Sequence, residues 1–318
     1  MSAMSCCPIC KNQEIGQFRR IEYAENPRQN TWGYDCFKDK KLVRCPQCSF
    51  VFTYESFEEG SLSKFYSTLY KDNDIRNEKY NASTFYEYRP RNYSHVNFIR
   101  RSYDFFDGMN ILEIGPNHVG MVPTFSLYCN PKYFYYEQYD FPIINHYGGK
   151  RLGNYFSKQE ALKLDEEQRM DLITLSHSFE HFEPSTINES IEAMYSALKV
   201  NGCLSIEVPY EEEHEMMAPH TLFFTVENIS KLLTDHGFEI VATQINKRLG
   251  TSSGVQTNNL TPKKSKYSVL KKILKPLLSF KLVRDLALWM TERYVDKKVK
   301  VLYDGWPYLR VLARKPNE

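Results

Sequence analysis

Two pairs of cysteines near the start of the chain have the spacing of metal ligands. Cys7 with Cys10 and Cys45 with Cys48 each enclose two residues, and a proline follows the first cysteine of each pair. Such knuckles can present four thiolates to one tetrahedral ion. In a reducing compartment the pattern indicates structural zinc rather than disulfides, because four thiolates leave no position open for water. Unliganded thiols are the alternative.

A second group of residues could move protons. His177, Glu180 and His181 lie within seven residues that follow an apolar run, and His220 comes later. A neutral imidazole is the commonest base near neutral pH, so His181 and His220 are the candidates for accepting a proton or positioning an acceptor. Alternatively, either histidine only hydrogen-bonds a loop. A metalloprotease helix is excluded by Pro184, whereas a divalent cation on these histidines and Glu180 is a weaker possibility.

A turn in the middle of the chain could hold a nucleotide. The apolar stretch 111–114 contains Glu113 and runs into Gly115, Asn117 and Gly120. Glycine has no Cβ and allows a ligand to approach the backbone, while asparagine tolerates left-handed dihedrals. The N–H groups that open the next helix would face the ligand. We therefore expect a bound adenosyl cofactor, although a purely structural turn would have similar residues.

The stretch Tyr133–Glu137 is aromatic and favours a strand, with an acid at its carboxyl end. An acid about 20 residues beyond a glycine-containing turn can accept hydrogen bonds from two ribose hydroxyls. Glu137 is the candidate for that role, and a solvated strand end is the alternative.

Strands and helices alternate along the rest of the central region. Apolar strands are predicted at 170–175 and 202–209, and a helix with a buried stripe of apolar residues is predicted between them. This order indicates a mostly parallel sheet that is covered on both faces. Ligands in such sheets lie beyond the carboxyl ends of the strands, so residues after 175 and 209 should line the site.

These features resemble the class I S-adenosylmethionine-dependent methyltransferases. Glu113-Ile114-Gly115 is similar to the first motif of that family, and Phe179-Glu180-His181-Phe182 is similar to the segment after its fourth strand. The resemblance covers residues 106 to 246 and implies a Rossmann-like, doubly wound α/β fold with a seven-stranded sheet, preceded here by a small zinc ribbon. It implies S-adenosylmethionine as cofactor and these cofactor-binding residues: Glu113, Gly115, Asn117, Gly120, Glu137 and His177.

The sequence departs from the family pattern at two points. The family repeats glycine at alternate positions after its acid, whereas this chain has Gly115, Asn117 and Val119, with a further glycine at 120. The acid expected to contact adenine is missing from residues 153–157. Either the turn is one residue longer or Asn117 replaces a glycine, and adenine recognition stays open.

Composition is that of an ordinary globular protein. The chain has 318 residues, 42% hydrophobic and 25% charged, and a length that allows about two domains. A net charge of +2 argues against nucleic acid as the default partner. With no apolar run of about 20 residues and no signal peptide, we expect a cytoplasmic location.

The last part of the chain interrupts the expected sheet. Residues 263–300 contain twelve Lys or Arg against three acids, and a final strand is expected at 308–314. The basic segment could close over a phosphorylated acceptor, lie on a membrane surface, or be a solvated helix pair. We predict four parts: a zinc ribbon at 1–58, a helical connector at 59–105, a methyltransferase core at 106–250, and the insertion with the last strand at 251–318.

A ribbon, a segment like 62–70 and this fold together resemble bacterial enzymes that methylate sugars in nucleotide-linked or surface-polysaccharide pathways. The resemblance implies methyl transfer to a sugar, a nucleotide sugar or a related cell-envelope precursor. A ribbon-guided RNA or DNA methyltransferase is one alternative, and a catalytically degenerate binding protein is another. The sequence leaves open the acceptor, the methylated atom and the oligomeric state.

Overall fold

The structure is a computed structural model of the chain. It describes residues 4–25, 34–58, 60–66, 82–116, 120–137, 149–153, 161, 163–246 and 307–317.

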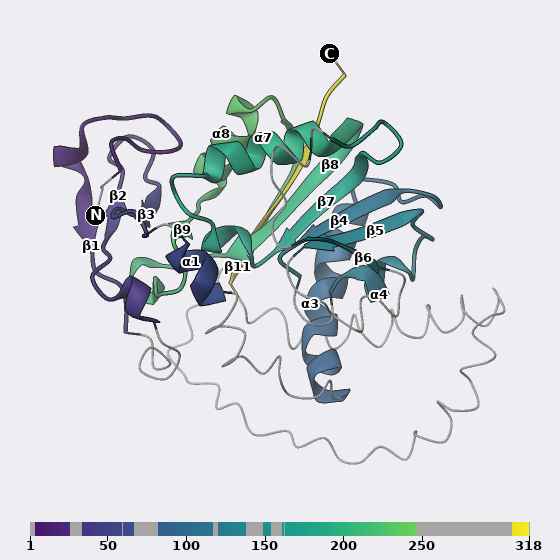
Figure 1. Ribbon diagram of the computed structural model, residues 1–318, viewed down its shortest axis with the longest axis horizontal. Coiled ribbons are helices and arrows are strands. Elements are labelled where there is room, and N and C mark those ends of the chain that lie inside the picture. The colour runs from purple at the N-terminus through teal and green to yellow at the C-terminus, as the bar shows by residue number, and fades with distance from the viewer. Residues whose placement is uncertain are drawn as a thin grey trace.

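A seven-stranded sheet forms the centre of the molecule (Figure 1). Its strand order is β10-β11-β8-β7-β4-β5-β6, and the neighbours from β8 to β6 are parallel, whereas β11 is antiparallel to both of its neighbours. The strands are β4 (Asn110–Ile114), β5 (Tyr133–Glu137), β6 (Gly149–Gly153), β7 (Met170–Ser176), β8 (Leu198–Pro209), β10 (Glu239–Asn246) and β11 (Tyr308–Arg314). This confirms the predicted Rossmann-like α/β class and the antiparallel final strand.

Helices cover both faces of the sheet because successive strand residues point to opposite sides. In Figure 1, α7 (Ile187–Ala197) and α8 (Val226–Asp235) lie on one face, and α3 (Ala82–Arg100) and α4 (Val122–Phe125) lie on the other. Leu112 packs in the cluster that contains residues of α7 and α8, whereas its neighbour Ile111 packs in the cluster with α3 and α4. The two cores leave the carboxyl ends of the parallel strands available for a site.

The N-terminal part forms a second, four-stranded sheet to which the core contributes a strand. Its strands are β1 (Arg19–Ile21), β2 (Leu42–Arg44), β3 (Val51–Thr53) and β9 (Leu222–Phe223), in the order β1-β2-β3-β9. In the antiparallel pairing of β3 with β9, Val51 lies opposite Phe223. Because β9 begins two residues after His220, the N-terminal sheet is joined to the segment that carries this candidate residue.

Aromatic side chains continue that junction into the core. The ring of Phe50, in the N-terminal part, lies 5.2 Å from the ring of Phe224, which stacks at 5.1 Å on Phe179. Phe50, Phe179 and Phe224 belong to one hydrophobic cluster with the side chains of α7 and α8. The N-terminal sheet and the seven-stranded sheet therefore share a core.

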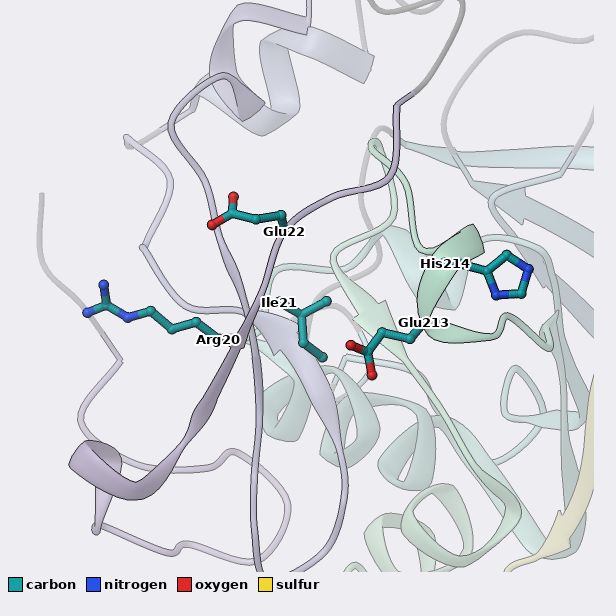
Figure 2. Close-up of a pocket in the computed structure, with 5 residues that line it drawn as sticks. All are labelled: Arg20, Ile21, Glu22, Glu213 and His214. Atoms are coloured by element: carbon teal, nitrogen blue, oxygen red, sulfur yellow. The ribbon is translucent and has the colours of Figure 1, made fainter.

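A shallow depression of about 410 Å³ lies between β1 and the short helical turn Glu213–Glu215 (Figure 2). In Figure 2 the side chains of Ile21 and Glu213 point toward each other, whereas His214 points away from them. Arg19 and Arg44 both pair with the Glu213 carboxylate, Arg44 at 3.1 Å. The acid in the depression is therefore already paired with two arginines. The depression does not bring together a set of reactive groups.

Several expectations lie outside the described residues. Asn117 and the basic segment 263–300 are among them, and Glu137 is described as the last residue of β5 without its side chain. The four-part division of the chain stays a prediction. In the part of the chain that the structure describes, no helix has the length and apolar character needed to cross a bilayer.

Candidate active site

The predicted cofactor side of the site lies where β4 and β5 end. Gly115 has a φ of 64° and Gly120 a φ of 62°, left-handed values that side chains rarely tolerate. In the parallel register of the two strands Glu113 lies opposite Tyr136, so the backbone of Glu137 follows at the same edge as Gly115. The turn and the acid that the sequence predicted as cofactor-binding thus belong to adjacent strand ends.

Glu113 supports this turn from within the protein. Its side chain is buried, and its Oε2 accepts a hydrogen bond of 2.7 Å from the backbone N–H of Met121. Burial raises the pKa of Glu113 to about 8, although the Met121 N–H opposes the shift. From the other side, Asn92 of α3 donates to the carbonyl of Gly120 at 2.6 Å. The carboxyl end of the turn, at Gly120 and Met121, is therefore held by two buried polar side chains.

His177 directly follows β7 and has a left-handed φ of 52°. Its Nε2 lies 3.2 Å from Oε1 of Glu207, and its Nδ1 lies 3.7 Å from Oε1 of Glu180. Burial, and then the charge of Arg91, lower the pKa of His177 to about 4, so this imidazole is neutral at neutral pH. The sequence predicted His177 as a cofactor contact, and the structure orients it toward two acids.

A second group of side chains, which we call the acceptor side, contains the two histidines selected from the sequence, His181 and His220. The rings of His181 and His220 lie 4.9 Å apart at an angle of 65°. Nδ1 of His181 is 2.8 Å from the hydroxyl of Tyr66, and Nδ1 of His220 is 2.8 Å from Oε2 of Glu211. These residues come from four separate segments, and neither Tyr66 nor Glu211 was selected from the sequence.

Glu180 lies beside both histidines and is almost fully buried. Its Oε2 has no hydrogen-bond partner among the described residues, and its Oε1 is 3.8 Å from Nε2 of His181. Burial raises the pKa of Glu180 to about 7, against the opposing charge of His220. Ligand atoms of Glu180, His181 and His220 lie within 4.8 Å of one another, so a divalent cation is sterically conceivable here.

A buried charge network that the sequence analysis missed lies behind His177. Glu207 of β8 is fully buried, and it accepts hydrogen bonds from Arg310 at 2.5 Å, Arg91 at 3.1 Å and the Ser176 hydroxyl at 3.0 Å. Glu207 and Arg310 face each other in the β8–β11 register. The sequence does show an acid, Glu207, and a base, Arg310, inside two otherwise apolar strands. That the two residues pair could be known only from the order of the strands in the sheet.

Replacing Glu207 by glutamine is expected to destabilise the protein by about 3–5 kcal/mol, because it leaves two arginines facing a neutral group in the core. Burial works to raise the pKa of Glu207, but Arg310 and the neighbouring histidines hold it well below 4.5. The carboxylate therefore stabilises the fold fully above about pH 4.5, and this contribution declines as pH falls below that value. Urea denaturation at several pH values measures both effects.

Glu239→Gln is the matched control, because Glu239 pairs with Arg314 across the neighbouring strands at 2.8 Å but is exposed. We expect its unfolding curve to stay close to that of the wild type. A Glu207→Gln curve equal to that of the control would show that the buried network contributes no net stability.

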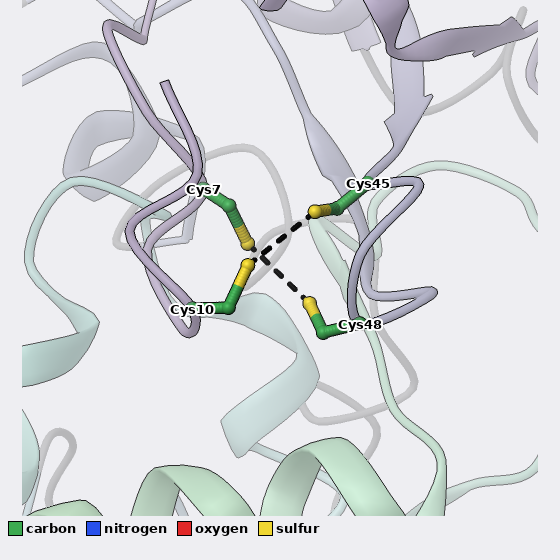
Figure 3. Close-up of side chains that lie close together, drawn as sticks. All are labelled: Cys7, Cys10, Cys45 and Cys48. Atoms are coloured by element: carbon green, nitrogen blue, oxygen red, sulfur yellow. Dashed lines mark hydrogen bonds between the residues drawn. The ribbon is translucent and has the colours of Figure 1, made fainter. Parts of the chain in front are cut away.

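The four predicted cysteine ligands converge on one point (Figure 3). Sγ of Cys7 is 3.6 Å from Sγ of Cys48, and Sγ of Cys10 is 3.5 Å from Sγ of Cys45. Four sulfurs at about 2.3 Å from a tetrahedral ion would be roughly 3.8 Å apart, so this arrangement fits a metal. Ligand atoms of all four lie within 4.8 Å of one another.

The two knuckles have the same local structure. Lys11 and Ser49, each following the second cysteine, have positive φ values of 60° and 58°. Their N–H groups donate at 2.9 Å to the carbonyls of Cys7 and Cys45, respectively. Each turn thereby points two thiols to the same side, and the paired turns form one four-sulfur site.

The model of a methyltransferase-domain family matches residues 85–243. The chain belongs to this methyltransferase family. It is an S-adenosylmethionine-dependent methyltransferase with the seven-stranded sheet and the antiparallel seventh strand described above. Among curated protein sequences, a search found no match.

Several solved structures are similar to the methyltransferase. A Burkholderia thailandensis 1,6-didemethyltoxoflavin N1-methyltransferase with bound S-adenosylhomocysteine has 13% identity over 88% of this chain and 97% of its own, with a TM-score of 0.47. The N-methyltransferase NodS of Bradyrhizobium japonicum has 12% identity, coverage of 72% and 87%, and a TM-score of 0.41. A methyltransferase from Archaeoglobus fulgidus has 14% identity, coverage of 74% and 100%, and a TM-score of 0.42.

Within the methyltransferase, the site has two chemically different halves. The ends of β4 and β5 offer backbone groups and one strand-end acid, which suit an adenosyl group. The segments after β7 and β8 offer two imidazoles and two carboxylates, and Tyr66 adds a phenol, groups that suit proton transfer or hydrogen bonding to an acceptor. The hydroxyl of Ser178 donates to the carbonyl of Ile114 at 2.9 Å and links the two halves.

Proposed function

We propose that the methyltransferase transfers a methyl group to a sugar, a nucleotide sugar or a related cell-envelope precursor. The observation that carries this proposal is the group formed by His181, His220, Tyr66 and Glu211 beside the strand ends that form the cofactor side. Such closely spaced donors and acceptors suit an acceptor with several hydroxyl groups. The small net charge of +2 is compatible with a small acceptor and does not favour a nucleic acid as the default partner.

The chemistry requires little beyond alignment and proton removal. S-adenosylmethionine, when bound, supplies an activated methyl group on its sulfonium. Gly115, Gly120 and Glu137 would hold the adenosyl end, and Asn117 belongs to the same proposed set. His181 and His220 would then position the acceptor atom in line with the methyl group and take its proton.

We also propose that the four cysteines hold structural zinc. The sulfur spacings fit a tetrahedral ion, and a shell of four thiolates has no open position for catalysis. The ion would stabilise the N-terminal sheet, whose strand β3 pairs with β9 directly after the acceptor-side residues His220 and Thr221. Its proposed role is thus to support the acceptor side of the site.

A transfer assay tests the function. Zinc-loaded protein is incubated with methyl-labelled S-adenosylmethionine and a panel of nucleotide sugars, free sugars and short RNA and DNA strands. Label recovered in a sugar-containing product is the expected outcome. Exclusive labelling of RNA or DNA would support a nucleic-acid methyltransferase instead. Turnover of no acceptor, together with no cofactor binding in calorimetry, would favour a degenerate binding protein.

The variant Glu137→Ala is expected to weaken cofactor affinity about 10- to 100-fold, because two hydrogen bonds from ribose to a charged acceptor are lost. Isothermal titration with S-adenosylhomocysteine measures the change, and circular dichroism checks that the fold is retained. Glu167→Ala is the control, since Glu167 is an exposed acid whose carboxylate pairs with Lys132 at 3.2 Å. Equal affinities for the two variants would remove Glu137 from the ribose site.

A further inference from the structure

The two neighbouring imidazoles of the acceptor side are held by chemically different partners. Nδ1 of His220 lies 2.8 Å from a carboxylate oxygen of Glu211, whereas Nδ1 of His181 lies 2.8 Å from the hydroxyl of Tyr66. We propose that Glu211 is a positioning residue that makes His220 the proton acceptor and leaves His181 to orient the acceptor. This inference rests on the proposed function, which gives His181 and His220 two roles jointly. Here proton removal is assigned to His220 and orientation of the acceptor to His181.

The Glu211 contact selects the reactive nitrogen of His220. An ionised carboxylate only accepts hydrogen bonds, so its partner Nδ1 must carry the proton. The lone pair of the neutral ring is then on Nε2, and the hydrogen bond fixes the plane of the ring. Both side chains are largely shielded from solvent, at 18% exposed for His220 and 13% for Glu211, which strengthens their interaction.

The backbone of His220 is fixed independently of its side chain. The hydroxyl of Tyr23 donates to the carbonyl of His220 at 2.9 Å and lies 2.7 Å from the hydroxyl of Thr53. The N–H of the next residue, Thr221, donates to the carbonyl of Glu180 at 2.8 Å. A base held at both its backbone and its ring loses little orientational freedom when the acceptor binds.

The charges that face His220 come from every segment around it. Glu211 follows β8, Tyr23 follows β1, and three of the groups, His177, Glu180 and His181, follow β7. Burial works to lower the pKa of His220, but the charge and hydrogen bond of Glu211, with Glu180, raise it above 6.5. The low pKa of His177 leaves that ring neutral and without effective repulsion. Glu211 is the charged group nearest to the ring.

In the part of the chain that the structure describes, Nδ1 of His181 contacts two neutral groups. That nitrogen meets the Tyr66 hydroxyl, and the carbonyl of Pro219 lies 3.4 Å from it. Both groups are neutral dipoles, which stabilise an imidazolium far less than a carboxylate does. The acid nearest to its Nε2 is Glu180 at 3.8 Å, a buried carboxyl whose pKa of about 7 keeps it partly protonated at neutral pH.

The proposed step is balanced in protons and electrons. The acceptor atom gives its proton to Nε2 of His220 and its electron pair to the methyl carbon. The electron pair of the broken carbon–sulfur bond stays on the sulfur, which becomes a neutral thioether. The imidazolium, stabilised by Glu211, later releases its proton to water, so both residues return to their starting states.

The variant Glu211→Gln tests the inference through the pKa of His220, which can be measured without an acceptor. In protein with isotope-labelled histidine, NMR titration should show the pKa of His220 falling by about one unit or more, because the neutral amide removes the counter-charge. Glu211→Asp should retain most of the wild-type value, since it keeps the charge. Glu212→Gln, in the exposed neighbouring residue, should leave the titration unchanged.

The pH profile of kcat/KM is a second measurement. A purely structural role of Glu211 would not change it. Because the base must be unprotonated, the acidic limb of kcat/KM should move to lower pH in Glu211→Gln by the shift that NMR gives for His220. The plateau should fall about 10-fold or more, since the base is weaker and less well oriented. A well-folded enzyme whose acidic limb does not move would overturn the inference.

Two further results would also overturn it. One is a titration of His220 that is the same in wild type and Glu211→Gln. The other is a second bound zinc ion that stops both His181 and His220 from titrating, which would make them ligands with Glu180. Failure of the proposed function itself would give a different result. The pKa of His220 would still fall in Glu211→Gln, but the wild-type enzyme would transfer no label to any acceptor.

Discussion

The variant Cys45→Ser should lose zinc and the folded N-terminal sheet, and with them acceptor turnover, while it keeps its affinity for the cofactor. Small four-cysteine modules derive about 10 kcal/mol or more of their stability from the ion. The N-terminal sheet has three short strands of its own, and Cys45 is part of its buried core. Without the ion these strands have too little apolar area to fold independently.

The separation of the two effects follows from how the N-terminal sheet contacts the core. It reaches the acceptor side through the N–H of Thr53, which donates to the carbonyl of Thr221 at 2.9 Å, and through the bond from Tyr23 to His220. The cofactor side is built from β4 and β5, which pair within the other sheet. Loss of zinc should therefore release residues 218–224 and leave the turn at Gly115 in place.

Three measurements check this prediction. Metal analysis should give one zinc per wild-type chain and none in Cys45→Ser, and hydrogen exchange should rise at residues 218–224. Titration with S-adenosylhomocysteine should give a similar Kd for both proteins. Cys6→Ser is the control, because Cys6 lies outside the four-cysteine group. Full activity in zinc-free protein would show that the ion has no part in supporting the site.

The variant His220→Ala should reduce kcat by about 10²- to 10⁴-fold, the contribution of a positioned base. The imidazole lies at the meeting point of the acceptor-side groups, 4.9 Å from the ring of His181, and its loss also leaves Glu211 without that partner. Cofactor affinity should not change, because the strand ends of β4 and β5 do not include this residue. Steady-state assays with a labelled methyl group measure kcat and KM separately.

His214→Ala is the matched control for this prediction. His214 follows the same strand, β8, but its side chain is 75% exposed and points away from Glu213 in the depression of Figure 2. Its removal should leave kcat within about twofold of the wild type. Equal kcat values for His220→Ala and the wild type would exclude a role for His220 in proton transfer.

Local sequence patterns were sufficient for much of the fold. The spacing of Cys7, Cys10, Cys45 and Cys48 predicted a metal-ligand group, and the structure brings their sulfurs together. The apolar runs predicted the parallel strands, and the stretch at 308–314 predicted the antiparallel last strand. These inferences succeed because a knuckle, a strand and a glycine turn each depend on residues close together in the chain.

The sequence was less informative about the partners of each site residue. His181 and His220 could be selected by type, because imidazoles after two strand ends suit proton transfer, but neither Glu211 nor Tyr66 stood out from neighbouring polar residues. The expectation that His177 contacts the cofactor remains a prediction, and the structure turns its ring toward Glu207 and Glu180. Nothing in a local pattern specifies which of several acids a histidine will meet.

The sequence by itself determined the class of fold, the glycine turn that follows β4 and the grouping of the four thiols, since backbone periodicity and short spacings encode them. Only the tertiary structure decided that β9 joins the N-terminal sheet, that Glu207 pairs with Arg310, and that Glu211 holds His220. Each of these contacts joins segments whose meeting depends on the order of strands and the packing of the core. The energy of a buried charge or hydrogen bond depends on its surroundings, and those are set only when the whole chain has folded.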